Sequence, residues 1–152
     1  MSFSYNTKSE ICRLMPESKC CAVAECYGML LFGNLFTSRE IRIITGNRAI
    51  GERIIERFSC AFSIDFDYLP REGARGKQQY VIIDREKLRN VFEVYGFSMD
   101  KLLALHVNLS VLEEECCRRS YIRGAFLTGG AVTDPAKSYH LELVTAYYYV
   151  SR

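Results

Sequence analysis

The sequence CCRRSYIRGAFLTGG, residues 116–130, decides the fold, because part of its pattern occurs twice in the chain. A shift of 96 positions aligns residues 20–36 with residues 116–132, and 5 of the 17 aligned positions are identical. The identical pairs are Cys20 with Cys116, Cys21 with Cys117, Gly28 with Gly124, Leu31 with Leu127 and Gly33 with Gly129. A doubled cysteine and two glycines at matched spacing indicate an internal repeat.

Small residues recur four positions apart in both copies, as Ala24 and Gly28 in the first and Ser120 and Gly124 in the second. Glycine inside a helix costs about 1 kcal/mol relative to alanine, so its repetition needs a physical reason. Each glycine could fit only its own local core. The matched spacing favours direct contact between two helices, near the short end of the usual separation of about 8–10 Å.

Hydrophobic spacing and turn residues predict the remaining elements. Helices are expected over residues 7–14, 18–33, 47–58 and 85–95, with a short helix opening at residue 98 and a longer one at residue 110. Strands are expected over residues 41–44, 62–68, 80–83 and 139–150, with a turn at residues 73–76. Thr7 with Glu10, and Ser110 with Glu113, match the capping box that begins a helix. This order of helices and hairpins predicts an α+β fold.

Composition predicts an ordinary globular protein. The chain has 152 residues, 49% hydrophobic and 25% charged, and a net charge of +2, which is too small to identify a polyanionic partner. The N-terminal residues lack the basic and apolar regions of a signal peptide, and no apolar stretch has the length of a membrane span. We therefore expect a cytoplasmic protein with access to the nucleoid and no membrane partner.

Seven cysteines without a signal peptide indicate free thiols in a reducing compartment. Metal binding is the alternative, but the chain has no C-x-x-C motif and its only histidines are His106 and His140. Adjacent cysteines on a helix point in different directions, which argues against a shared ion. The sequence therefore predicts buried structural cysteines, with no metal site and no cofactor.

Residues 123–130 (RGAFLTGG) resemble the LAGLIDADG motif, the paired helix at the centre of homing endonucleases, and residues 27–34 (YGMLLFGN) form a weaker second copy. More narrowly, the chain resembles the WhiA family of bacterial sporulation and cell-division transcription regulators. The matching residues are 2–4, 8–10, 116–130, 134–135 and 139–142. The resemblance covers essentially the whole chain. It implies a LAGLIDADG-like pseudo-twofold repeat with two central helices packed together and antiparallel hairpin strands.

The resemblance also implies that no catalytic residue remains. In the endonucleases, an acidic residue before the final glycine of each motif holds a divalent metal for phosphodiester cleavage. Gly33 and Gly129 occupy those positions here, and the nearest acids, Glu40 and Asp134, follow several residues later. Asp134 precedes a proline and is expected to shape a turn. We therefore expect a protein that is not an enzyme.

DNA is the partner that the resemblance implies, because strands of LAGLIDADG domains lie in the major groove. The corresponding strands here would be residues 41–44, 62–68, 80–84 and 139–144. Their candidate DNA-contacting residues are Arg39, Arg42, Arg71, Arg75, Lys77 and Lys137, opposed by Asp65, Asp67 and Glu142. With this modest set, we expect weak or non-specific binding by this chain alone.

The two copies have unequal lengths. Repeat one covers about residues 20–115, whereas residues 116–152 form a shorter second copy, so we expect one LAGLIDADG-like N-terminal domain over residues 1–152 with a truncated second repeat. The helix-turn-helix domain that WhiA-like proteins carry has no counterpart in this sequence. Two other functions stay open. One is an active homing endonuclease, and the other is a protein-interaction module that regulates a DNA-binding partner domain.

Overall fold

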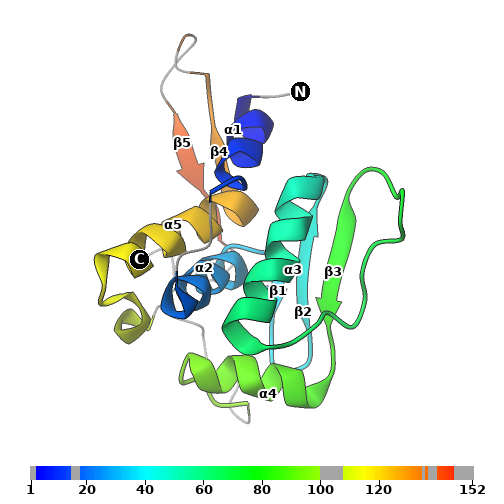
Figure 1. Cartoon of the computed structure of the whole chain (residues 1–152), viewed down its shortest axis with the longest axis vertical. Coiled ribbons are helices and arrows are strands. Elements are labelled where there is room, and N and C mark those ends of the chain that lie inside the picture. Colours follow the sequence, from blue (N-terminus) through cyan, green and yellow to red (C-terminus); the bar gives the residue numbers. More distant parts are fainter. Residues whose placement is uncertain (1–2, 15–17, 100–107, 135, 137–139, 146–152) are drawn as a thin grey trace.

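The computed structural model describes residues 3–14, 18–99, 108–134, 136 and 140–145, and two helices lie at its centre (Figure 1). These are α2 (Lys19–Leu31) and α5 (Glu115–Gly129), which share the most extensive contact between any two described elements. Ser18 caps the N-terminus of α2, and its side chain accepts a hydrogen bond from the backbone N–H of Cys21. The predicted pair of central helices is therefore confirmed.

The two glycines of the repeat lie where the helices touch. A Cβ on Gly28 would lie inside van der Waals contact with the carbonyl oxygen of Tyr121 and 2.6 Å from the amide nitrogen of Ala125. A Cβ on Gly124 would likewise overlap the carbonyl group of Glu25. Only hydrogen fits between the two backbones, which is why both positions are glycine.

Each central helix leads into an antiparallel hairpin. The first hairpin is β1 (Leu35–Phe36) with β2 (Ile41–Thr45), and β3 (Gln78–Ile82) extends it into a sheet of order β1-β2-β3. The second is β4 (Gly130–Val132) with β5 (Leu141–Leu143). The same shift of 96 positions that aligns the helices places β1 on residues 131–132 of β4. The hairpins thus extend the repeat beyond the helices.

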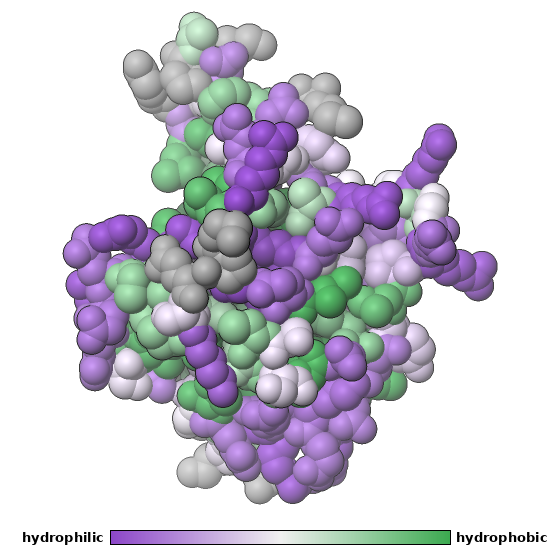
Figure 2. Space-filling model, viewed as in Figure 1, coloured by the Kyte–Doolittle hydropathy of each residue, from purple (hydrophilic) through white to green (hydrophobic). Residues whose placement is uncertain are grey.

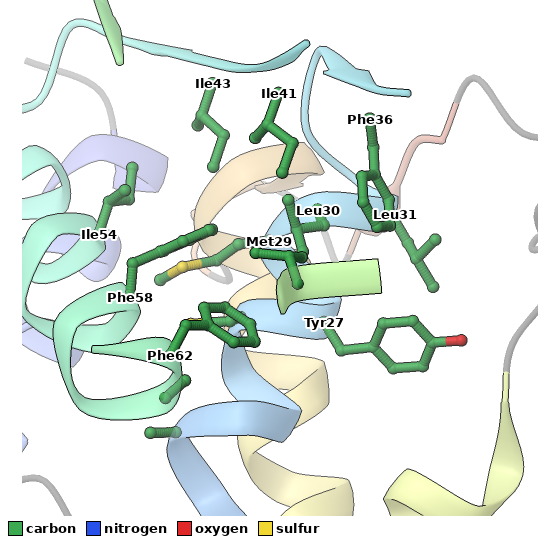
Figure 3. Packing of buried hydrophobic residues seen from close by; sticks show 14 of the residues in the cluster. Tyr27, Met29, Leu30, Leu31, Phe36, Ile41, Ile43, Ile54, Phe58 and Phe62 are labelled. Atoms are coloured by element: carbon green, nitrogen blue, oxygen red, sulfur yellow. The ribbon is translucent and has the colours of Figure 1, made fainter. Parts of the chain in front are cut away.

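Three further helices surround this centre. They are α1 (Phe3–Ile11), α3 (Arg48–Phe62) and α4 (Arg85–Val94), and a short 3-10 helix, η1 (Leu109–Leu112), precedes α5. Asn47 and Asp84 begin α3 and α4 through side chains that accept hydrogen bonds from backbone N–H groups. The face of the sheet that carries Ile41 and Ile43 packs toward α3 and α2 (Figure 3).

Three local predictions were wrong. Thr7 does not begin a helix, because α1 starts at Phe3 and the Thr7 hydroxyl donates to the Phe3 carbonyl inside it. Ser110 lies within η1, and the following helix begins at Glu115. Residues 62–68 form no regular strand, because α3 extends to Phe62 and only Tyr68 pairs with β3, in an isolated antiparallel bridge with Val81, whereas β3 pairs along its length with β2. Residues 100–107, where the helix predicted from residue 98 would continue, lie outside the described residues. Of the strand predicted over 139–150, residues 141–143 form β5, and residues 139 and 146–150 lie outside the described residues.

A buried ion pair joins α2 to α3. The Glu25 carboxylate accepts hydrogen bonds from Arg53 at 2.7 and 2.9 Å, and Arg123 of α5 approaches it at 3.4 Å. Arg53 also donates to the carbonyl oxygens of Cys12 and Leu14, just beyond α1. Directly and through Arg53, this buried carboxylate connects α2, α3, α5 and the segment that follows α1.

Gly124→Ala should lower the free energy of unfolding by about 3 kcal/mol, because the added methyl group overpacks the helix contact. Intrinsic helix propensity alone would favour alanine by about 1 kcal/mol, so the sign of the change separates the two effects. Urea unfolding measures it, with Gly46→Ala as the matched control. Around Gly46 the nearest atoms would lie 3.8 Å from a new Cβ, and we expect little change there. A neutral or stabilising Gly124→Ala would contradict the contact.

Arg53→Met should lower the free energy of unfolding by roughly 3–5 kcal/mol, because Glu25 would remain buried with its charge poorly compensated. The control is Arg48→Met, which removes an exposed ion pair with Glu52 on the same helix. Such surface pairs contribute about 1 kcal/mol or less. Equal losses of stability for the two variants in urea unfolding would show that the buried pair has no special role.

Candidate functional site

The C-terminal ends of α2 and α5 carry no acid at the positions that the nuclease motif requires. A Cβ on Gly129 would lie 2.5 Å from the carbonyl oxygen of Val144 and 2.6 Å from that of Phe32. A Cβ on Gly33 would lie 2.5 Å from the carbonyl oxygen of Met29. These positions therefore lack both a metal-ligating side chain and the space for one.

The nearest acids are occupied elsewhere. Glu40 accepts a hydrogen bond from Arg42 at 2.7 Å on the sheet surface. Asp134 accepts one from the backbone N–H of Ala136 at 2.9 Å, which confirms the predicted turn. His140 lies 3.1 Å from the Glu142 carboxylate in an exposed pair, and His106 lies outside the described residues.

Three of the six candidate DNA-contacting residues meet on one surface. Arg42, Arg71 and Lys77 line a shallow hollow on the outer face of the β1-β2-β3 sheet. Tyr68 and Gln79 also line it, so the hollow offers cations, an exposed aromatic ring and an amide. We call this surface the sheet face. Its composition suits phosphate and base contacts.

The other three candidates lie apart from that hollow. Arg39 is exposed in the turn before β2. Arg75 lines a neighbouring hollow at the end of the sheet, together with Arg48 and Arg71. Lys137 lies outside the described residues.

Asp65 and Asp67 do not lie on a groove-facing strand, since residues 63–67 form a connecting segment. The Asp67 carboxylate accepts hydrogen bonds from Lys87 at 2.8 Å and from the backbone N–H groups of Ile83 and Asp84, each at 2.7 Å. Burial acts to raise the pKa of Asp67, but these hydrogen bonds outweigh it and lower the pKa below its ordinary value. Asp67 is thus paired, and it opposes an approaching phosphate less than the sequence implied.

Four cysteines meet at the N-terminal ends of the central helices. The sulfur atoms of Cys20, Cys21, Cys116 and Cys117 all lie within 4.8 Å of one another. The expectation that adjacent cysteines diverge too far to meet was wrong here, because each helix contributes a pair and the two pairs face each other. Among the described residues, this is the only group of three or more potential metal ligands so close together.

The four thiols differ in environment. Cys21 and Cys117 are buried, Cys116 is half-buried and Cys20 is exposed. Burial, together with the neighbouring thiols, raises the pKa of Cys117 to about 12. Hydrogen bonds with Ser18, whose oxygen lies 3.0 Å from the Cys20 sulfur, and with Cys117 lower the pKa of Cys20. A thiol with a lowered pKa therefore lies beside one with a raised pKa.

Several proteins named WhiA have sequences similar to this chain. The family model of the WhiA LAGLIDADG-like domain matches residues 118–152. The chain is 33% identical over 156 residues to a probable cell division protein WhiA of Ruminiclostridium cellulolyticum, covering 95% of this chain and 49% of the relative. A probable cell division protein WhiA of Bacillus cytotoxicus is 36% identical over 155 residues, with 97% and 49% covered. The chain is thus similar to proteins named WhiA over at least 95% of its own length.

The fold of this chain matches that of a solved LAGLIDADG domain. A crystal structure of the N-terminal LAGLIDADG domain of DUF199/WhiA superposes with a TM-score of 0.64 at 18% identity, covering 95% of this chain and 67% of that one. The α+β fold of LAGLIDADG type is therefore confirmed. The chain spans about half the length of the curated relatives that it matches. No helix among the described residues is both long enough and apolar enough to span a membrane.

The sequence pattern predicted the helix contact but not the cysteine group. The signal was present, since the doubled cysteines lie at the same shift as the contacting glycines. Helices that run in the same direction and touch at Gly28 and Gly124, with equal spacing to both cysteine pairs, bring those pairs close together. The two pairs have to be considered jointly, rather than one helix at a time, for the group to be predicted.

Proposed function

We propose that this chain is a catalytically inactive LAGLIDADG-like domain of a DNA-binding regulator of cell division and sporulation. The observation that carries the proposal is the close packing around Gly33 and Gly129, where nuclease acids would stand. The role in cell division comes from the similar proteins, since they are named for it. Over residues 1–152 the domain would position a DNA-reading segment or a partner rather than cleave DNA.

The sheet face supports contact with nucleic acid. Arg42, Arg71 and Lys77 present side-chain cations in one hollow, and cationic side chains dominate affinity for the phosphate backbone. The ion pair between Arg42 and Glu40 reduces the charge available there. Together with the net charge of +2, this favours weak binding with little sequence preference.

A second candidate function, a protein-interaction module, rests on a different surface. An apolar hollow lies between α5 and the β4–β5 hairpin, and hydrophobic residues reach the surface over this hairpin, whereas the surface over α4 is hydrophilic (Figure 2). The hollow is lined by Ile11, Ile122, Phe126, Val132, Leu141 and Leu143. Such a surface suits a protein partner better than a phosphate backbone.

Magnesium or manganese should neither raise the melting temperature of the chain nor support cleavage of supercoiled or linear DNA. Hard divalent cations need oxygen ligands near the scissile phosphate, and the helix ends offer none from a side chain. Scanning calorimetry and a plasmid-nicking assay with an EDTA control measure both effects. Nicking that requires metal and disappears in Glu40→Gln or Asp134→Asn would show that one of these acids has taken over catalysis.

Duplex DNA should bind the chain with a dissociation constant of about 10⁻⁴ to 10⁻⁶ M at physiological salt, the range of non-specific contact. Replacing Arg42, Arg71 and Lys77 together by alanine should weaken binding. It should also reduce the slope of log affinity against log salt by about 0.9 for each phosphate that is no longer neutralised. The matched control replaces three exposed arginines on α4 and α5, namely Arg85, Arg89 and Arg119.

Mobility-shift titrations at two salt concentrations, with operator and scrambled duplexes, measure these effects. Equal reductions in affinity for the two triple variants would contradict the proposal that DNA contacts the sheet face. Nanomolar, sequence-selective binding would make the domain itself the reader of DNA sequence. No binding at all would favour the protein-interaction module.

A further inference from the structure

We propose that Cys20, Cys21, Cys116 and Cys117 bind one zinc ion as a tetrathiolate that joins the N-terminal ends of α2 and α5. Their sulfur atoms lie within 4.8 Å of one another. A tetrahedral ion with Zn–S bonds of about 2.3 Å separates its sulfur ligands by about 3.8 Å. The sulfur separations therefore exceed those of a tetrahedral shell by about 1 Å at most.

The helix contact prepares this geometry. Gly28 and Gly124 hold the two backbones together about two turns from the cysteines, and the repeat places each pair in the first turn of its helix. The ligands thus come from two segments far apart in sequence, and binding would link residues 20–21 to residues 116–117. An ion there stabilises the folded chain because the unfolded chain does not hold the four sulfurs together.

Charge and access also suit an ion. Binding displaces the four thiol protons to solvent, and four thiolates with one Zn²⁺ leave two net negative charges. These charges lie at the positive ends of two helix dipoles, which stabilise them. The Ser18 hydroxyl, 3.0 Å from the Cys20 sulfur, can donate a hydrogen bond to that thiolate. Cys20 is exposed, whereas Cys21 and Cys117 are buried, so an ion has an entry side and a closed interior.

Soft ligands select the metal. Thiolates favour zinc and iron–sulfur clusters over magnesium or manganese, and a closed set of four thiolates is typical of structural zinc. The inference is independent of the proposed function, since it concerns the opposite ends of the central helices from Gly33 and Gly129. A zinc site would act by stabilising the helix pair, whatever the domain contacts.

Metal titration of the whole chain tests the proposal. The chain is reduced, stripped with EDTA and titrated with Zn²⁺ or Co²⁺. We expect one metal ion per chain by elemental analysis and a rise in melting temperature of about 5 °C or more. With cobalt we expect the intense visible absorption of a tetrahedral site and a thiolate-to-cobalt charge-transfer band.

Cys20→Ser combined with Cys116→Ser should abolish the stoichiometric metal binding, the rise in melting temperature and both cobalt absorption bands. The double variant removes one ligand from each helix at the two more accessible positions. The matched control is Cys12→Ser combined with Cys60→Ser, two half-buried cysteines outside the group, which should leave the signals unchanged. The cobalt spectrum of the unaltered chain decides the geometry even where the first variant fails to fold.

Four results would overturn the proposal. They are the absence of stoichiometric binding, an octahedral cobalt spectrum, metal binding that survives in the folded Cys20→Ser and Cys116→Ser variant, and an iron–sulfur chromophore in the chain as purified. Disulfides among these four cysteines provide a further test. The chain is purified without reductant, and its intact mass is measured. A mass lower by two hydrogen atoms for each disulfide, with no metal bound, would assign the group to redox chemistry instead.

Discussion

The close contact between α2 and α5 is the constraint on which the rest of the structure depends. At Gly28 and Gly124 each helix approaches the backbone of the other so closely that no side chain fits between them. This contact sets the position of both ends of the pair. It brings four cysteines together at the N-terminal ends, and at the C-terminal ends it leaves Gly129 against the carbonyl oxygens of Phe32 and Val144. The hairpins follow directly from those crowded ends.

The sequence was informative where one local pattern carried a tertiary meaning. Glycine is costly inside a helix, so its repetition at one spacing predicted the contact between helices, and the structure confirms it. The stripe of Ile50, Ile54 and Ile55 predicted α3, and the structure buries Ile50 and Ile54 and half-buries Ile55. The family resemblance added the LAGLIDADG type of the fold, which the solved domain confirms.

The sequence was less informative where one residue pattern is compatible with two local structures. Ile64 and Phe66 are buried while Ser63 and Asp65 are exposed, so the alternation over this segment is real. It reflects a segment that covers the core and meets β3 at one antiparallel bridge, Tyr68 with Val81, whereas β3 pairs along its whole length with β2. The capping pattern of Thr7 failed for a related reason. The helix had already begun at Phe3, and the hydroxyl could bond within it.

The two ends of the helix pair differ in what they bring together: one end gathers four cysteines, and the other packs Gly129 against backbone carbonyl groups. A catalytic end needs space for two carboxylates and a hydrated ion, which holds the helix termini apart. Glycine at positions 33 and 129 removes that need and lets the termini pack against Phe32 and Val144. An acid restored at Gly129 would therefore first have to displace backbone atoms of another segment. The proposed loss of catalysis is thus a property of the packing as well as of the missing carboxylates.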